Sequence, residues 1–350
     1  MGLRLLVGTV KGGFWVTSRD RVSWNVEGPF FAGWKVTAGL RMEDGRFLIG
    51  VASDIYGPAL QVSSDLENWK QIEDGPAYSG AEGPKLRQIW KLAERHGSIY
   101  AGVQDAGLFV SRDGADTWEP VSGLNDHETR PGWVPGAGGL CAHALLFDER
   151  NADKMWVGIS AVGVFRTDDG GATWSPKNEG VRTVLEDKTH KDIGRCVHGL
   201  TQDPENPDLI YRQDHSGMYR TTNGGDTWER NESGLPAAFG FPIVSDRASA
   251  SLFVAPQQSD QFRIPVDNRL QIYRSTDGGD TWHGASKGLP ESNSFGTVLR
   301  GAMAVDDMEP GGVYFGTTSG TLHASADLGE SWTNLPASLP RVLHVSAWVD

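Results

Sequence analysis

Histidine recurs at one position in segments of the chain that align with one another. Residues 196–203 (CVHGLTQD) lie over residues 141–148 (CAHALLFD), so that His198 falls on His143. A third segment (PRVLHVS) fits the same frame and contributes His344. An imidazole titrates near neutral pH and can move a proton, so these three histidines are candidate catalytic residues. A neutral, hydrogen-bonded packing role is the alternative, and metal ligation is a third interpretation.

Cationic side chains recur three residues before the histidine position. The residues with this spacing are Lys35, Arg87, Arg195 and Arg341. Arg300 lies near the start of a similar segment (VLRGAMAVD), and Trp90 takes the histidine position of another (LRQIWKL). With His215 from a nearby hairpin, these residues form the candidate ligand-binding set. A basic collar inside an acidic chain would attract an anion, whereas single arginines at strand ends are commonly solvated or paired with loop carboxylates.

Cysteine precedes histidine by two residues in two of these segments. Cys141 with His143, and Cys196 with His198, suit zinc because alternate residues of a strand share a face and both ligand types bind that ion. Duplication of one repeat would give the same pattern without a metal, so zinc is the weaker interpretation and no cofactor is predicted. Two cysteines also do not make a disulfide framework.

A turn that recurs along the whole chain must position these candidates. The clear copies are Thr167–Trp174 (TDDGGATW), Thr221–Trp228 (TTNGGDTW), Ser275–Trp282 (STDGGDTW) and Ser325–Trp332 (SADLGESW). Ser111–Trp118 has Ala115 where the glycine is expected, Ser63–Trp69 is one residue short, and Thr17–Trp24 has Arg19 at the acidic position. The terminal tryptophans are 45 to 56 residues apart, a period typical of propeller blades.

Each residue type in a copy has a structural role. Asp and Gly favour a tight turn, and the tryptophan supplies a large apolar body for packing between units. The copies resemble the Asp-box, or BNR, repeat of sialidases, xyloglucan-degrading glycosidases, sortilin-type receptors and a photosystem assembly factor. The resemblance implies an all-β fold, a seven-bladed β-propeller with one domain over residues 1–350. It also implies inner strands that line a central channel, with ligand sites where those strands begin.

The ends of the chain are expected to meet. The last apolar run, 342–348, has no strands after it, and the first run, 3–8, lacks a preceding strand. We therefore expect the C-terminal run to become the innermost strand of the N-terminal blade, which closes the ring and protects sheet edges.

Several loops extend the candidate site. Val121–Gly139 and Pro176–Gly194 are longer than a turn needs, and long loops on a rigid scaffold often carry function. Asp214 lies in the hairpin with His215. It is expected to orient an imidazole or to act as a base, and an ordinary Asx turn is the alternative. Phe262–Pro265 (FRIP) looks like the arginine motif of sialidases, but it lies inside the sixth repeat rather than before the repeats. We interpret it as coincidence, and classical sialidase activity is not expected.

Composition limits the possible partners. The net charge of −13 argues against nucleic acid, and no run is long and apolar enough to cross a membrane. The start of the chain lacks the pattern of a secretory signal, so a cytoplasmic protein is expected. The expected partner is a small anionic ligand or an acidic saccharide, and the oligomeric state is left open.

Two functions compete. In the first, a central funnel binds a carboxylate-bearing ligand through the cations, and a histidine moves a proton in a hydrolase of glycosidase or lactonase type, or in a lyase. In the second, the ring is a non-catalytic binding or assembly propeller whose loops meet a protein partner. The Asp-box does not decide between them, because the fold hosts enzymes, receptors and scaffolds.

Overall fold

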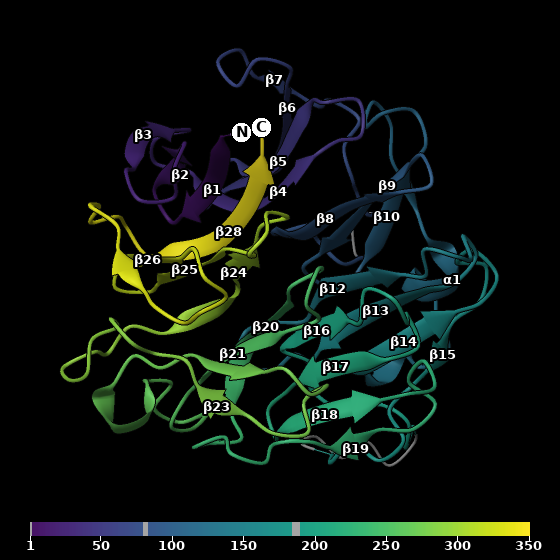
Figure 1. The fold of residues 1–350 in the computed structure, drawn as a ribbon. Coiled ribbons are helices and arrows are strands. Elements are labelled where there is room, and N and C mark those ends of the chain that lie inside the picture. The colour runs from purple at the N-terminus through teal and green to yellow at the C-terminus, as the bar shows by residue number, and fades with distance from the viewer. Residues whose placement is uncertain (1, 80–82, 184–189) are drawn as a thin grey trace. The chain divides into compact units, whose positions relative to one another are not determined.

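The structure is a computed structural model that describes residues 2–79, 83–183 and 190–350. The chain divides into two compact units. Unit 1 comprises Met1–Val36, His198–Thr222 and Glu229–Asp350, and unit 2 comprises Thr37–Val197 and Asn223–Trp228. Part of the predicted loop Pro176–Gly194, residues 184–189, lies outside the described residues. The predicted all-β fold is confirmed, since strands form nearly all of the regular structure in both units (Figure 1).

Unit 1 contains one eight-stranded sheet and two four-stranded sheets. The large sheet has the order β27-β26-β25-β24-β28-β1-β2-β3. Its strands are β1 (Leu3–Thr9), β2 (Gly12–Ser18), β3 (Asn25–Phe30), β24 (Val298–Val305), β25 (Val313–Thr317), β26 (Leu322–Ser325), β27 (Thr333–Asn334) and β28 (Val342–Val349). The others are β16 (Gly199–Gln202), β17 (Ile210–Gln213), β18 (Met218–Thr221), β19 (Glu229–Arg230), β20 (Gly240–Ser245), β21 (Leu252–Pro256), β22 (Tyr273–Ser275) and β23 (His283–Gly284), with the short helix η2 (Val266–Asn268).

Unit 2 contains three four-stranded sheets of successive strands. They are formed by β4 (Lys35–Arg41), β5 (Phe47–Ser53), β6 (Gly57–Ser63), β7 (Lys70–Gln71), β8 (Ile89–Arg95), β9 (Ser98–Val103), β10 (Leu108–Ser111), β11 (Glu119–Pro120), β12 (Cys141–Phe147), β13 (Met155–Ser160), β14 (Gly163–Thr167) and β15 (Ser175–Pro176). Strand β4 begins in unit 1 with its first two residues. Helices α1 (Ser122–Asn125) and η1 (Arg130–Gly132) lie in the loop before β12. No helix among the described residues is long and apolar enough to cross a membrane.

The repeated turn is held by its own side chains. Asp277 accepts hydrogen bonds from the Ser275 hydroxyl at 2.7 Å and from the Thr281 backbone N–H at 3.0 Å. The Ser275 hydroxyl oxygen in turn accepts the N–H of Gly279, at 2.8 Å, and Gly279 has a φ of +83°. Glycine adopts that region at no steric cost. The turn therefore needs Ser/Thr, Asp and Gly at these positions, as the sequence pattern indicates.

The first repeat corrects the predicted register. Asp20, rather than Arg19, accepts the turn hydrogen bonds, from Ser18 at 3.1 Å and from the N–H of Ser23 at 2.7 Å. Asp65 does the same in the second repeat, where Ser63 donates at 3.1 Å. Both turns are one residue shorter than the later copies, so the acidic position lies one residue later than an alignment on Thr17 gives.

Two box tryptophans of unit 1 join successive repeats. Trp282 and Trp332 are buried, and their indole N–H groups donate to the carbonyls of Asn231 at 3.1 Å and Ala285 at 2.7 Å, which belong to the preceding repeat. On the outside, an arginine on each of the third strands β14, β18 and β22 reaches the next turn. These ion pairs are Arg166–Asp226 in unit 2 and Arg220–Asp280 and Arg274–Glu330 in unit 1.

The first strand of each four-stranded group carries the predicted segments. Strand β28 pairs antiparallel with β1, from Leu3 opposite Val349 to Thr9 opposite Val342, as the terminal runs predict. In unit 1 the first strands β16, β20 and β24 contact one another in that order. Several first strands have a register shift near their start, for example between Gly240 and Ile243 in β20. Such bulges re-aim side chains at functional ends of sheets.

Candidate functional site

A cluster of imidazole and aromatic rings lies in unit 1 where β16 and β20 begin. His198 is 3% exposed, and its ring centroid lies 4.9 Å from that of Phe241 and 5.2 Å from that of Phe239. The Nδ1 atom lies 2.6 Å from the carbonyl oxygen of Gly240. A carbonyl only accepts, so Nδ1 carries the proton and Nε2 is the basic nitrogen of the neutral ring. His198 therefore ties β16 to β20 and contributes an imidazole to the cluster.

His215 joins this cluster from the turn between β17 and β18. Its ring centroid lies 5.7 Å from that of His198 and 5.3 Å from that of Phe239. Its Nε2 atom lies 2.9 Å from Oδ2 of Asp260, in the loop after β21. The His215 side chain is 30% exposed and the Asp260 side chain 54% exposed. A carboxylate accepts hydrogen bonds, so Nε2 donates to Asp260. Nδ1 is then the nitrogen of the neutral ring that can accept a proton.

Two guanidinium groups approach the ring of Phe241 in the same cluster. The Cζ atoms of Arg300 and Arg263 lie 5.1 and 5.9 Å from its centroid, within the range of cation–π attraction. Arg263 also donates from Nε to the carbonyl of Asp260 at 3.0 Å. Both guanidinium groups carry a positive charge, so this part of the cluster can attract an anion. The cluster thus combines imidazole, carboxylate and two cations.

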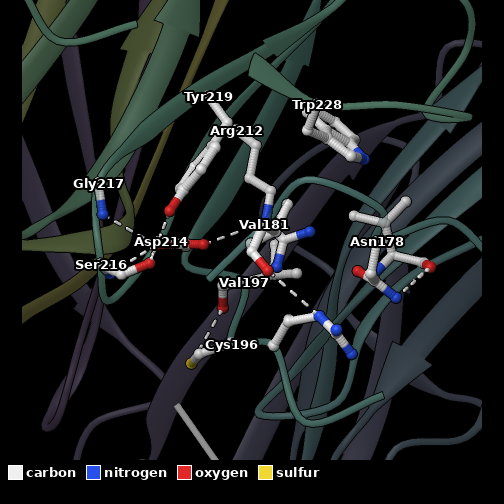
Figure 2. A network of polar contacts seen from close by, with 12 residues as sticks. Asn178, Val181, Cys196, Val197, Arg212, Asp214, Ser216, Gly217, Tyr219 and Trp228 are labelled. Carbon is white, nitrogen blue, oxygen red and sulfur yellow. Dashed lines mark hydrogen bonds and ion pairs between the residues drawn. The ribbon is translucent and has the colours of Figure 1, made fainter. Parts of the chain in front are cut away.

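A buried carboxylate fixes the turn that presents His215. Asp214 is 1% exposed and accepts hydrogen bonds from the backbone N–H groups of Ser216, at 2.5 Å, and Gly217, at 3.0 Å (Figure 2). Its Oδ2 lies 3.4 Å from Nε of Arg212, which is fully buried. Burial raises the pKa of the Asp214 carboxyl, and Arg212 and the turn donors oppose that shift. The predicted Asx turn is confirmed.

Gln213 connects this turn to the strand that carries Phe241. Its side-chain amide is 1% exposed and donates to the carbonyls of Asp214 at 3.1 Å and Ala238 at 2.9 Å. The hydroxyl of Ser216 also contacts the Tyr219 hydroxyl at 3.0 Å, which braces the turn from β18. The His215 turn is therefore held on both sides by buried polar contacts rather than by loop packing alone.

The other predicted residues of unit 1 lie at the starts of first strands. His344 is buried on β28, where its Nε2 lies 2.6 Å from the Ser346 hydroxyl, and it is opposite Gly301 of β24. Arg341 is exposed just before β28, and Lys35 is half-buried at the start of β4. Of the predicted set, His198, His215 and Arg300 are brought together in one cluster.

Unit 2 brings together two other predicted residues. Trp90 and His143 are each the extra residue of a bulge, in β8 and β12, and their rings lie 6.5 Å apart. His143 is buried and donates from Nε2 to the Val197 carbonyl at 2.9 Å. The sequence alignment gave Trp90 and His143 equivalent positions, and the strand register agrees with it.

The two predicted arginines of unit 2 have backbone and loop partners. Arg87 is exposed, with Nε 3.7 Å from Asp105. Arg195 donates to the carbonyls of Val181 at 3.3 Å, of Ile193 at 2.8 Å, and of Lys191. Arg195 therefore holds the described parts of its own loop. The predicted collar divides between the two units and stays a prediction.

The predicted zinc set is also divided. Cys141, His143 and Cys196 belong to unit 2 and His198 belongs to unit 1. Both cysteines are buried and neither forms a disulfide, and Cys196 Sγ lies 3.4 Å from the Ser160 hydroxyl. The zinc interpretation stays untested.

Sequence reasoning missed four members of the cluster: Phe239, Phe241, Asp260 and Arg263. The FRIP segment contains Arg263, but its position among the repeats led to its interpretation as coincidence. A usable signal was the loop itself, because the segment between β21 and β22 is long and contains no box.

Comparison with known proteins gives the fold and a class of relatives. No family model matches the chain. It is 26% identical over 233 residues to a xyloglucanase of Paenibacillus sp., covering 58% of this chain and 22% of the relative. It is 35% identical over 181 residues to the oligoxyloglucan-reducing end-specific xyloglucanase of Emericella nidulans, covering 49% of this chain and 19% of the relative. The chain therefore spans about a fifth of the length of the curated relatives it matches.

Solved structures agree on the architecture. An ancestral GH74 enzyme superposes with a TM-score of 0.55 at 16% identity, covering 89% of this chain and 37% of that one. The WD40 beta propeller domain of Doa1 superposes with a TM-score of 0.59 at 10% identity, covering 94% of this chain and 90% of that one. At these identities the likeness concerns the fold alone. The chain has a β-propeller fold, and the curated relatives it matches are xyloglucanases.

Proposed function

We propose that the chain is a seven-bladed Asp-box propeller, closed by β28, that binds an acidic saccharide through the cluster of unit 1 and cleaves it. The xyloglucanase relatives favour a saccharide as the ligand class. Arg263 and Arg300, which share the ring of Phe241, favour a saccharide with a carboxylate. A local pair of cations attracts such a group even though the whole chain is acidic.

The observation that carries the proposal is the His215–Asp260 pair beside these two arginines. Asp260 holds the imidazole with Nε2–H toward its carboxylate, at 2.9 Å, which leaves Nδ1 as the base. Neutralisation of a substrate carboxylate by guanidinium groups makes the adjacent C–H more acidic, because the charge that develops is stabilised. Partial exposure of His215 lets a substrate reach it.

The chemistry that fits is elimination from a uronate. The proton on the carbon next to the carboxylate moves to Nδ1 of His215, and the electrons of that C–H bond form a carbon–carbon double bond. The bond from the neighbouring carbon to the glycosidic oxygen breaks, and this oxygen takes a proton from water. No oxidant or further reactant is needed, and His215 returns its proton to solvent.

Hydrolysis is a second candidate, because the curated relatives are named as xyloglucanases. Glycoside hydrolysis uses two carboxyl groups that flank the scissile bond. Within the described cluster Asp260 is the exposed carboxylate, while Asp214 is buried against Arg212. The geometry therefore supports elimination better than hydrolysis.

Incubation with oligouronates tests both candidates. Elimination gives an unsaturated product that absorbs in the ultraviolet, with one new reducing end per double bond, whereas hydrolysis gives reducing ends without the absorbance. We expect the unsaturated product, its loss in His215→Ala and Arg300→Met, and its retention in Arg247→Ala. Arg247 is exposed in the turn between β20 and β21, at the other end of that sheet. Binding of oligouronates without product would instead identify a non-catalytic binding propeller.

A further inference from the structure

Two exposed phenylalanines lie next to the cluster. The chain has 13 phenylalanines, and among the described residues Phe262 and Phe295 are the two that are exposed, each at 58%. Phe262 lies between Asp260 and Arg263, which both belong to the cluster. An exposed aromatic ring gains nothing from burial in the free protein, and exposed apolar side chains beside a site often mark where a ligand lies.

The loops that carry the two rings are joined. The carbonyl of Arg263 accepts a hydrogen bond from the Thr297 hydroxyl, two residues after Phe295. The N–H of Ser294 donates to the carbonyl of Asn268 at 2.9 Å. Two separate hydrogen bonds therefore hold the segment around Phe295 against the loop that carries Phe262, at the end of the sheets where β24 begins.

Both loops are held in a defined conformation. The N–H of Arg263 donates to the Ser259 carbonyl at 2.9 Å, and Arg263 itself has a φ of +50°, a region that costs energy for a residue with a side chain. Behind Phe295, a Cβ atom on Gly296 would lie 2.5 Å from the Ser319 hydroxyl oxygen, so this backbone packs closely on the turn between β25 and β26. The rings are thus presented by constrained backbone.

We propose that Phe262 and Phe295 form an aromatic platform for a second sugar residue of the ligand. This inference rests on the proposed function of the cluster. The acidic residue of the saccharide binds at Arg263 and Arg300, and the apolar C–H face of the adjoining residue lies on the platform. The ligand is therefore an oligosaccharide rather than a single uronic acid.

Calorimetric titration with galacturonate and tri-galacturonate tests the platform, in a parent chain that carries His215→Ala so that the trisaccharide is not cleaved. We expect the parent chain to bind the trisaccharide more tightly than the monosaccharide. Phe262→Ala and Phe295→Ala should each weaken trisaccharide binding by about three- to tenfold, the range for loss of one aromatic contact, and leave monosaccharide binding within about twofold. Phe262→Tyr keeps the ring and should keep the affinity. Tyr56→Ala removes an aromatic side chain that is 77% exposed in unit 2 and serves as the control.

Different failures are distinguishable in this experiment. Unchanged trisaccharide affinity in both alanine variants, or equal affinity of the parent chain for the two ligands, overturns the platform and leaves the proposed function standing. An equal loss for both ligands in Phe262→Ala also overturns it, since the ring would then act through Arg263. If the parent chain binds neither ligand, the proposed function fails together with the platform.

Discussion

Arg220 lies 2.7 Å from the Asp280 carboxylate of the following repeat, and the same guanidinium nitrogen lies 2.9 Å from the Gly278 carbonyl. The arginine thus binds both a side chain and the backbone of the next turn. Arg274 makes the same two kinds of contact with Glu330 and Leu328. These contacts fasten these two turns to the third strands of the preceding sheets.

Arg220→Met should lower the free energy of unfolding by about 1 kcal/mol, a value kept small because the Asp280 side chain is 61% exposed and screened by solvent. The rest of this loss in unfolding free energy comes from the hydrogen bond between Arg220 and the Gly278 carbonyl. Urea denaturation of Arg220→Met, Asp280→Asn and the double variant measures the pair. Additive effects of the two substitutions would contradict coupling between these side chains.

His323 makes stability depend on pH. It is 2% exposed and stacks on Phe315 with centroids 5.0 Å apart, and burial lowers its pKa from 6.5 to about 4. Between pH 6.5 and about 4, His323 binds a proton in the unfolded chain but stays neutral in the folded chain. The free energy of unfolding therefore falls as the pH drops through this range. The loss attributable to this group is about 3 kcal/mol. His323→Phe should flatten the dependence of the unfolding free energy on pH in this window, and an unaltered slope would disprove the assignment.

Asp214→Asn should destabilise the fold by about 3 kcal/mol, because it leaves the fully buried Arg212 without its counter-charge. Arg212→Met combined with Asp214→Asn removes both charges and should recover much of that loss. Chemical denaturation of the two variants makes the comparison. Ser216→Ala, which removes one donor at 2.9 Å, should cost less. A neutral effect of Asp214→Asn would mean that the pair does not stabilise the turn.

Gly102→Ala should destabilise unit 2 by about 2 kcal/mol through overpacking. A Cβ atom on Gly102 of β9 would overlap the carbonyl oxygen of Ala142 of β12. Gly284→Ala is the matched control, since nothing lies within 4 Å of its Cβ position. Thermal denaturation of both variants checks the difference, and equal melting temperatures would show that the two sheets can move apart without cost.

The repeated turn was predictable because its chemistry is local. Ser275, Asp277 and Gly279 lie within five residues and need one another for hydrogen bonding and for a positive φ, so the pattern survives in the sequence. The pairing of β28 with β1 was predictable for a different reason, since each terminal apolar run lacked a partner. The first turn is one residue shorter than the later copies, so the sequence alignment placed its acidic position one residue too early.

The cluster was predicted only in part. His198 and Arg300 stood at recognisable positions of first strands, and His215 stood in a hairpin. Asp260 and Arg263 come from a loop without a repeat pattern, and their contacts depend on how residues 257–268 fold back on β20. No periodicity specifies such a path.

The pairing of β1 with β28 also constrains how the protein is made. Arg4 binds Asp350 at 3.1 Å, so residues 346 positions apart in the sequence complete one sheet. While a ribosome is still synthesising the chain, β1 has no neighbour on that side, and an unpaired edge can capture other chains. Premature termination before residue 342 would leave this edge open for good, so aggregation of shortened products is the expected cost of this arrangement.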